Sequence, residues 1–397
     1  MKTRSTGRPR SSPNRRDQGS AGRRGTPDRR SNTTSEGASS RGGAGYADAR
    51  RMRRKALTLR ISPPLYARIT TIALALLTAI VFTGAAVRLT GSGLGCPTWP
   101  ECHGAVIQTE LDTHGAIEYG NRLLTGVVGA AAIAAFLAAF LRRPFRRDLA
   151  IIGALLPLGV VGQAVLGGMA VLYGLAPGWV MGHFLLSMVI LAGAVTLAWR
   201  ARHEPGAPAV NDRAVVLASR ALLPLAAWVL FLGTVVTASG PHPGSSGTGE
   251  VVHRLGFKGG ETLTWMIHWH GRFSTFFGLC AVATWVLARR RGATPQLRKA
   301  LTALCLLLAA QGVVGFVQYE TGLPSEIVWV HVALATCTWL AVLVSVASAG
   351  RLAPAAALTR AAAAHSVAPS PASPSPFVPQ PPSRFSRRPP RSPASGS

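Results

Sequence analysis

The feature that most constrains this chain is a set of eight apolar runs, each about 20 residues long. A helix rises about 1.5 Å per residue, so each run is long enough to cross the hydrocarbon core of a bilayer. Backbone polar groups find no water there, so each run is expected to be a helix with internal hydrogen bonds. The sequence therefore predicts an all-α membrane protein with eight transmembrane helices, near residues 66–88, 120–141, 149–172, 179–199, 214–238, 264–288, 298–318 and 326–348.

The distribution of Lys and Arg predicts how these helices are oriented. Basic segments lie at 50–60, 142–147, 200–220, 289–299 and from residue 351 onward. They alternate with less basic loops at 89–119, 173–178, 239–263 and 319–325. Basic loops of membrane proteins are enriched on the cytoplasmic side, so both termini are expected in the cytoplasm and the four less basic loops outside.

Both ends of the chain differ in composition from its centre. Residues 1–62 and 351–397 are rich in Arg, Ser, Gly and Pro and poor in aliphatic residues, so they are predicted to be disordered cytoplasmic tails. They carry most of the net charge of +27. Because the arginines flank apolar runs and do not line a folded face, the charge indicates attraction to lipid headgroups and not to nucleic acid.

The central region contains an internal repeat. The stretch 163–183 matches the stretch 311–331 at one constant offset, which pairs Gln163 with Gln311 and His183 with His331. The ends of the first and fifth apolar runs also match, with Gly84 on Gly233. A repeat of this length indicates duplication. We therefore expect two four-helix halves, residues 63–205 and 206–350, related by a pseudo-two-fold axis along the membrane normal.

The first outer loop contains two cysteines in the run G-L-G-C-P-T-W-P-E-C-H-G. Five residues separate Cys96 from Cys102, and two of these are proline. An outer compartment permits oxidation, so this spacing predicts a disulfide. Structural and redox-active roles for the pair both remain open.

Three histidines are predicted to lie inside the membrane near its outer face: His183, His270 and His331. In hydrocarbon such residues are functional candidates, although a neutral histidine bonded to a neighbouring helix carbonyl is an alternative. Two imidazoles on facing helices suit the two axial positions of a heme iron. Zinc is less suitable because it prefers about four ligands. Asn121 occupies the position that matches His270 in the repeat.

Glu118 is an acidic residue at the mouth of the second apolar run. It lies three residues before Asn121 and four before Arg122, so all three share one helix face. The sequence leaves two compatible roles open for Glu118, an ion pair with Arg122 and a general base beside a bound cofactor. Arg122 and Arg272 lie near the outer interface, where they can pair with carboxylates such as heme propionates.

Together these features resemble the heme A synthase family of membrane cytochromes over residues 66–348. The resemblance implies oxidation of a ring methyl of heme O to the formyl of heme A, by successive hydroxylations and loss of water. It implies a permanent heme b on His270 and His331, and substrate heme O in the first half. It also implies Glu118 as the catalytic acid/base and a location in the bacterial plasma membrane. In that family a histidine stands where this chain has Asn121, so His183 is expected to be the only strong axial ligand of the substrate.

Two other classes of function fit parts of the pattern. A b-type membrane cytochrome that only transfers electrons needs the same histidines but not Glu118. A transporter is often built from duplicated halves, but its polar groups are expected near the midplane. As partners, the resemblance implies heme O, the lipid bilayer and the farnesyltransferase that produces heme O. The sequence is also compatible with a homo-oligomer.

Overall fold

The computed structural model describes residues 60–96, 98–102, 112–205, 211–245 and 251–351. Eight of its helices are long and apolar enough to cross a membrane. This confirms the prediction of an all-α membrane protein. β1 (Phe257–Gly260) is the one named strand among the described residues. The helices are α2 (Pro63–Leu89), α3 (Thr113–Leu141), α4 (Arg147–Leu172), α5 (Pro177–Arg202), α6 (Arg213–Ser239), α7 (Thr262–Arg290), α8 (Pro295–Glu320) and α9 (Ser325–Ala349).

Most helix boundaries agree with the apolar runs to within about three residues, but α3 begins well before its run. The reason is a polar cap, because Asp112 accepts a hydrogen bond from the Gly115 amide at 2.7 Å. Such a cap satisfies backbone donors that the first helical turn leaves free. The earlier start places Glu118, Asn121 and Arg122 well inside the helix, so their shared face is part of α3.

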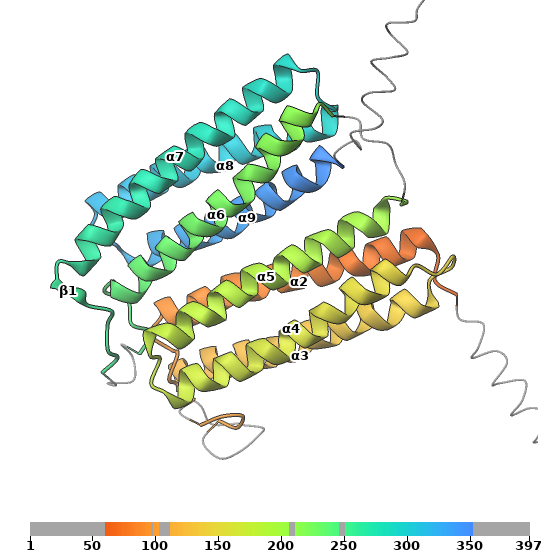
Figure 1. The fold of residues 1–397 in the computed structure, drawn as a ribbon. Helices are drawn as coiled ribbons and strands as arrows, with labels where there is room; N and C mark the ends of the chain where they lie inside the picture. Colours follow the sequence, from red (N-terminus) through yellow and green to blue (C-terminus); the bar gives the residue numbers. More distant parts are fainter. Residues whose placement is uncertain (1–59, 97, 103–111, 206–210, 246–250, 352–397) are drawn as a thin grey trace, which may run out of the picture. The chain divides into compact units, whose positions relative to one another are not determined.

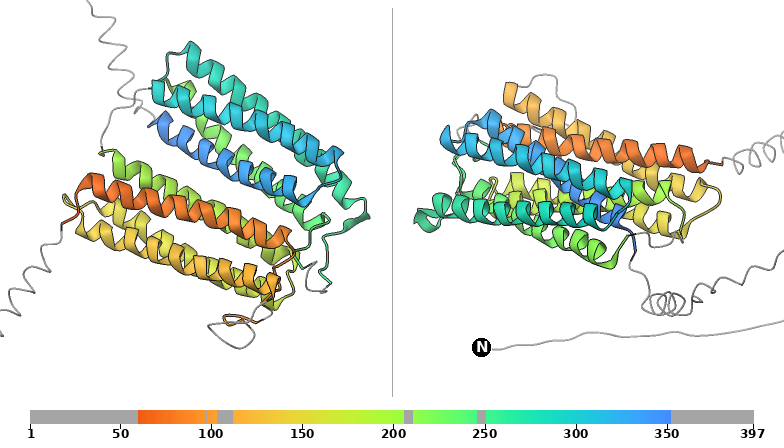
Figure 2. Two further views of the ribbon diagram at one scale, coloured as in Figure 1. Left: turned by 180° about the vertical axis from the view of Figure 1, so that it is seen from behind. Right: turned by 90° about the horizontal axis from the view of Figure 1, so that it is seen from above.

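The helices form two groups of four, α2 to α5 and α6 to α9, called here the first and the second half (Figure 1). In the first half, α2 packs against α3, α3 against α4, α4 against α5, and α5 against α2. In the second half, α6 to α9 form the same closed ring of neighbours. Two further views show the same two groups (Figure 2). The order of packing places α3 opposite α5 and α7 opposite α9, so these pairs face each other across the interior of each half.

Helix α9 provides most of the contact between the two halves, because it packs against both α2 and α5. Two tryptophans of α9 donate indole hydrogen bonds across this contact. Trp329 donates to the carbonyl of Phe82 at 3.0 Å, and Trp339 donates to the carbonyl of Met188 at 2.9 Å. The halves are therefore held together by polar contacts at two levels of α9 as well as by apolar packing.

Small residues allow the helices to approach closely inside each half. Ala132, Ala135 and Ala139 of α3 are fully buried, as is Ala281 of α7. Large apolar side chains such as Leu158 lie on the outside, as expected where helices meet lipid. The predicted tails lie outside the described residues, apart from 60–62 and 351. The pseudo-two-fold relation between the halves stays a prediction.

Candidate functional site

Two turns with the same backbone geometry lead into the helices that carry His183 and His331. Leu175 in the α4–α5 turn has φ of 56°, and Leu323 in the α8–α9 turn has φ of 63°. The amide of each leucine donates to the carbonyl five residues earlier, at 2.7 and 2.8 Å respectively. Positive φ is strained for leucine and persists where the surrounding structure holds it. Both turns thus set a fixed start for the next helix, and each histidine lies in the second turn of that helix.

A glutamine of the preceding helix binds the backbone of each of these two histidines. The side-chain amide of Gln163 donates to the His183 carbonyl at 2.9 Å, and that of Gln311 donates to the His331 carbonyl at 3.1 Å. Within a membrane such an interhelical bond fixes the register of two helices. The repeat detected in the sequence therefore corresponds to a repeated contact that fixes the depth of the histidine.

Each of the three histidine rings lies against a glycine of a neighbouring helix. A Cβ atom added at the glycine would lie 3.2 to 3.3 Å from the ring Cε1 atom in all three cases. This distance is shorter than ordinary carbon–carbon contact, so a larger residue would push the ring away. The pairs are Gly167 with His183, Gly315 with His331, and Gly233 with His270.

His270 and His331 face each other across the interior of the second half. Their ring centroids are 6.3 Å apart, and the ring planes are inclined by 63°. With a metal–nitrogen bond of about 2 Å and about 1 Å from nitrogen to ring centre, two imidazoles on opposite sides of one metal have centroids about 6 Å apart. The observed separation therefore fits a single iron held between the two rings.

One ring nitrogen of each of these histidines, Nδ1, lacks a hydrogen-bond partner. Nδ1 of His183, His270 and His331 is buried and makes no hydrogen bond of normal geometry. The imidazoles of His183 and His270 lie near the backbone of Gln163 and Val229 respectively. An imidazole can bind a metal through one ring nitrogen while the other nitrogen faces a backbone group. The described residues contain no group of three or more His, Cys, Asp or Glu side chains that could hold a metal ion.

In the first half, Asn121 stands at the position that corresponds to His270. Its Oδ1 accepts a hydrogen bond from the Thr83 hydroxyl at 2.8 Å. Thr83 is next to Gly84, which matches Gly233 in the repeat. A Cβ added at Gly84 would meet nothing within 4 Å, whereas one at Gly233 would meet the imidazole. The two halves thus differ at this position, since the first half has a shorter, hydrogen-bonded amide beside open space.

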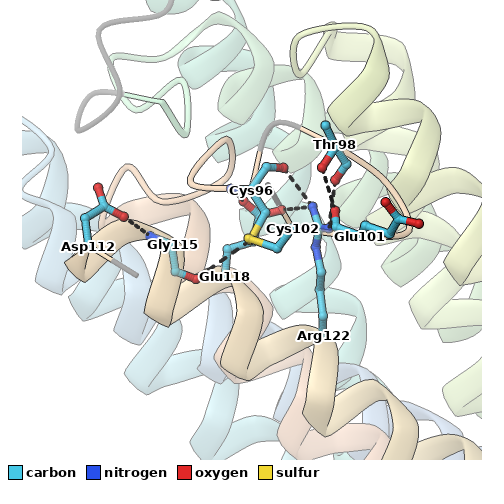
Figure 3. The surroundings of a disulfide bond; sticks show 8 residues. All are labelled: Cys96, Thr98, Glu101, Cys102, Asp112, Gly115, Glu118 and Arg122. Carbon is cyan, nitrogen blue, oxygen red and sulfur yellow. Dashed lines mark hydrogen bonds and ion pairs between the residues drawn. A yellow bond between two sulfur atoms is a disulfide. The ribbon is translucent and has the colours of Figure 1, made fainter. Parts of the chain in front are cut away.

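Glu118 is buried, and its two carboxylate oxygens bind Arg122 of the same helix and the first outer loop. Oε1 accepts from Nη2 of Arg122 at 2.6 Å, and Oε2 accepts from the Cys96 amide at 2.8 Å. Arg122 also donates to the carbonyls of Cys96, Thr98 and Glu101 at 2.9 to 3.1 Å. Figure 3 shows Arg122 extending from α3 into this loop. The predicted ion pair is present, and it fastens the loop to the helix.

The predicted disulfide between Cys96 and Cys102 is present, and both cysteines are buried. The loop that it closes packs closely on the outer ends of α3 and α4. A Cβ at Gly95 would lie 2.5 Å from the His114 backbone, and one at Gly168 of α4 would lie 2.7 Å from the Trp99 ring. The loop therefore covers the outer ends of α3, which carries Glu118, and of α4, the helix that precedes the one with His183.

Most arginines near the outer ends of the helices bind backbone carbonyls. Arg88 donates to the carbonyls of Thr237 and His242, and Arg254 donates to those of Thr237 and Gly240. Burial lowers the pKa of the Arg254 guanidinium from its usual value. Arg272 instead lies over the Trp269 ring at 5.1 Å, which leaves its N–H donors better placed than those of Arg88 and Arg254 to bind a ligand carboxylate.

Sequence reasoning missed two parts of this site. Gln163, Gln311 and the glycines of the repeat were recognised as matching residues. They were not recognised as the groups that fix the positions of the histidines. The contact between Gly233 and His270 had no signal in the sequence except the match of Gly233 to Gly84. That match shows where a glycine recurs but does not show which ring lies against it.

The fold and site define a multi-pass helical membrane protein with histidines set to face one another inside a helical bundle. A family model described as Cytochrome oxidase assembly protein (COX15-CtaA) matches residues 67–242. Proteins named Heme A synthase are similar to part of the chain. The one from Lysinibacillus sphaericus (strain C3-41) is 32% identical over 120 residues, and the one from Halalkalibacterium halodurans is 35% identical over 130 residues. These matches cover 30% and 32% of this chain, and 39% and 43% of the two relatives.

These findings support the predicted resemblance to the heme A synthase family. The aligned regions span about two fifths of the relatives' length. The family-model match includes Glu118, Asn121 and His183 but ends before His270 and His331. The pairing of those two histidines rests on the distance between their rings.

Proposed function

We propose that this protein is a heme A synthase, which oxidises a ring methyl of heme O to the formyl of heme A. The observation that carries the proposal is the facing pair His270 and His331, whose rings have the separation that one iron requires. In the first half, the His183 ring lies against a glycine in the same way, and this provides a second imidazole site. Converting the methyl to a formyl adds one oxygen and removes two hydrogens, which is a four-electron oxidation. We propose that successive hydroxylations followed by loss of water achieve this, with an oxidant from outside the chain, such as molecular oxygen, accepting the electrons.

In the second half, His270 and His331 would hold a resident heme b. Such a heme supplies one-electron exchange when bound. The protein's contribution is to fix both imidazoles, His331 through Gln311 and Gly315, and His270 against Gly233. Arg272, stacked on a tryptophan near the same helix end, would bind a propionate.

In the first half, His183 would bind the iron of the substrate heme from α5, and Asn121 would face it from α3. Asn121 is a weak ligand for iron because its amide oxygen is neutral and already accepts from Thr83. The substrate heme would therefore be held by one strong ligand, and Arg122 would contribute positive charge at the outer end. A singly ligated heme suits a substrate that must enter and leave.

We assign Glu118 the role of acid/base near the outer end of the substrate site. Its carboxylate is held by Arg122 and by the Cys96 amide, so its position is fixed before substrate binds. A proton held at Glu118 would weaken both contacts, since a neutral carboxyl attracts the guanidinium less strongly. The loop closed by Cys96 and Cys102 covers this end and would restrict access of water.

The proposal also includes the location of the protein in the cell and the source of its substrate. The alternation of basic and less basic loops supports a location in the bacterial plasma membrane with both termini in the cytoplasm. The substrate is apolar and carries a long farnesyl-derived tail, so transfer from the farnesyltransferase that makes heme O is the direct route of supply. We retain the pseudo-two-fold duplication as part of this proposal, since the matched turns and glutamine contacts support it.

The test is extraction of hemes from cells that make heme O, with and without this protein. Heme A is expected only when the protein is present, and its absence from cells with folded, heme-loaded protein would overturn the proposed activity. Purified protein should also show a b-type absorbance spectrum. Replacement of His270 or His331 by Ala should abolish that spectrum while the helical content is retained.

One observation favours a second function. Both oxygens of the Glu118 carboxylate are engaged, one by Arg122 and one by the Cys96 amide, as they would be in a purely structural residue. A b-type cytochrome that only transfers electrons would need no acid/base and would use the same histidines. Heme extraction separates the two functions, because the cytochrome would leave heme O unchanged.

A further inference from the structure

A groove at the basic end of the first half lies away from the site described above. It runs between the start of α2 and the end of α5 and has a volume of about 640 Å³. Arg68 and Thr71 line it from α2, and Arg202 lines it from α5, with Glu204 just beyond. Because α2 starts and α5 ends here, the groove lies at the end of the bundle opposite the Cys96–Cys102 loop.

The arginines of the groove keep most of their donors free. Arg202 makes one hydrogen bond within the described residues, from Nη2 to the Thr71 hydroxyl at 2.6 Å. That bond directs the guanidinium across the groove toward α2. Arg68 is exposed and makes neither a hydrogen bond nor an ion pair with any residue that the structure describes. Two guanidinium groups therefore border one hollow, with at least four N–H donors on each still available.

The acidic residue of the groove does not neutralise these two arginines. Oε1 of Glu204 is 3.1 Å from Nη2 of Arg142, which is fully buried, and Oε2 is 4.0 Å from Nη1 of Arg146. Both of these arginines belong to the α3–α4 connection. Since Glu204 is paired on that side, the charge left facing the groove is positive.

An apolar surface continues from the groove along α2. Ile72 lines the groove one turn further along α2 than Arg68, toward the membrane interior, and is 58% exposed. Exposed side chains of this kind on a membrane helix face lipid. Basic donors at the end of a helix and an apolar path leading toward the membrane interior are the two surfaces that a phospholipid needs.

We propose that this groove is a binding site for one anionic phospholipid. The phosphate would accept hydrogen bonds from Arg68 and Arg202, and one acyl chain would lie along Ile72. Guanidinium groups suit this ligand because they bind phosphate oxygens in a bidentate manner. Basic pockets between transmembrane helices bind acidic headgroups in this way. The site is independent of the proposed heme chemistry.

The test is native mass spectrometry of the full chain in detergent, titrated with phosphatidylglycerol and, separately, with phosphatidylcholine. Wild-type protein should retain one phosphatidylglycerol molecule in preference to phosphatidylcholine. Each of R68Q and R202Q should weaken this binding about fivefold, and the double variant about 25-fold, as expected for one surface arginine each. R68K/R202K keeps both charges and should lose much less.

The matched control is R290Q. Arg290 is an exposed arginine at the end of α7, on the same side of the membrane but in the other half. It should leave phosphatidylglycerol binding within about twofold of wild type, the spread expected for a distant surface charge. If R290Q weakens binding as much as R68Q/R202Q, the lipid responds to diffuse charge and the site is refuted.

Two further outcomes would overturn the proposal. Unchanged lipid binding by R68Q/R202Q would show that the groove is not the site. Displacement of phosphatidylglycerol by millimolar inorganic phosphate would show that the groove binds free phosphate without any contribution from the acyl chains. All variants change exposed side chains, so circular dichroism should show the same helical content, and binding can be compared directly.

Discussion

The seating of His331 against Gly315 predicts that a single added methyl group will disturb the proposed heme b site. A Cβ at Gly315 would lie 3.3 Å from Cε1 and 3.6 Å from Nδ1 of the ring. Ordinary carbon–carbon contacts are about 3.5–4.0 Å, so Gly315→Ala should displace the ring by a few tenths of an ångström. Gly312→Ala is the matched control, because the same change one turn earlier on α8 meets nothing within 4 Å.

The size of the effect follows from the cost of overpacking. Inserting a methyl group into a packed contact costs about 1–3 kcal/mol. If that cost falls on the bond between His331 and iron, retention of heme weakens by about 5- to 150-fold. Gly312→Ala gains the same helix propensity, up to about 1 kcal/mol, without this penalty. The difference in heme retention between Gly315→Ala and Gly312→Ala therefore measures the effect of the contact with the His331 ring alone.

The assay measures heme content per protein and the absorbance spectrum after purification. Gly315→Ala is expected to lose heme or to show the spectrum of a singly ligated iron, whereas Gly312→Ala should match wild type. Gly233→Ala tests the other ligand in the same way, since its Cβ would lie 3.2 Å from Cε1 of His270. Gly84→Ala, at the matching position of the first half, should have no effect on this heme.

The reasoning would be refuted by heme retention in Gly315→Ala and Gly233→Ala equal to that of their controls. That result would mean that ring position in the second half is not critical, and the assignment of His270 and His331 as paired ligands would lose its geometric support. Loss of heme in all four variants would instead indicate general disruption of the bundle. Circular dichroism distinguishes that case because helical content would fall.

Three further predictions concern the first half. Glu118→Gln breaks the charge pair with Arg122 and should lower the free energy of unfolding by about 1–3 kcal/mol, leave the b-type spectrum intact and stop heme A formation; product formed at the wild-type rate would reduce Glu118 to a structural role. Replacing Cys96 and Cys102 by Ser should cost about 2 kcal/mol in a thermal or denaturant assay, and thiol labelling of both cysteines in unreduced wild type would contradict the bond. Asn121→His should add a second imidazole to the substrate site and change the spectrum of bound heme O; an unchanged spectrum would show that residue 121 does not face the iron.

The sequence predicted the transmembrane helices closely because hydropathy is a local property. A run of apolar residues is sufficient to predict a helix in lipid, whatever packs beside it. The start of α3 was placed too late for the same reason, since residues 113–119 are not uniformly apolar. Asp112 begins that helix by accepting from the Gly115 amide, and this contact depends on a side-chain cap and not on hydropathy.

The partners of the arginines were much harder to predict. Arg88 binds the carbonyl of Thr237, 149 residues further along the chain, and Arg122 binds three carbonyls of a loop that precedes it. Any backbone carbonyl is a chemically suitable acceptor, so residue type gives no signal. The choice depends on how helices are rotated and aligned, which requires the three-dimensional arrangement. Only the pair of Glu118 and Arg122 was predictable, because both lie on one helix face.

The difference between the two halves argues for a division of roles within one fold. Two imidazoles 6.3 Å apart in the second half can fill both axial positions of an iron, which suits a cofactor that stays bound. In the first half, His183 lies against a glycine as His331 does. Asn121, however, accepts a hydrogen bond from Thr83, and the glycine next to Thr83 faces open space. Under the proposed duplication, a bundle that lost one ligand would retain the means to hold a heme while binding it less firmly. That weaker hold is what exchange of substrate for product requires, so the departure at Asn121 is consistent with catalysis in the first half.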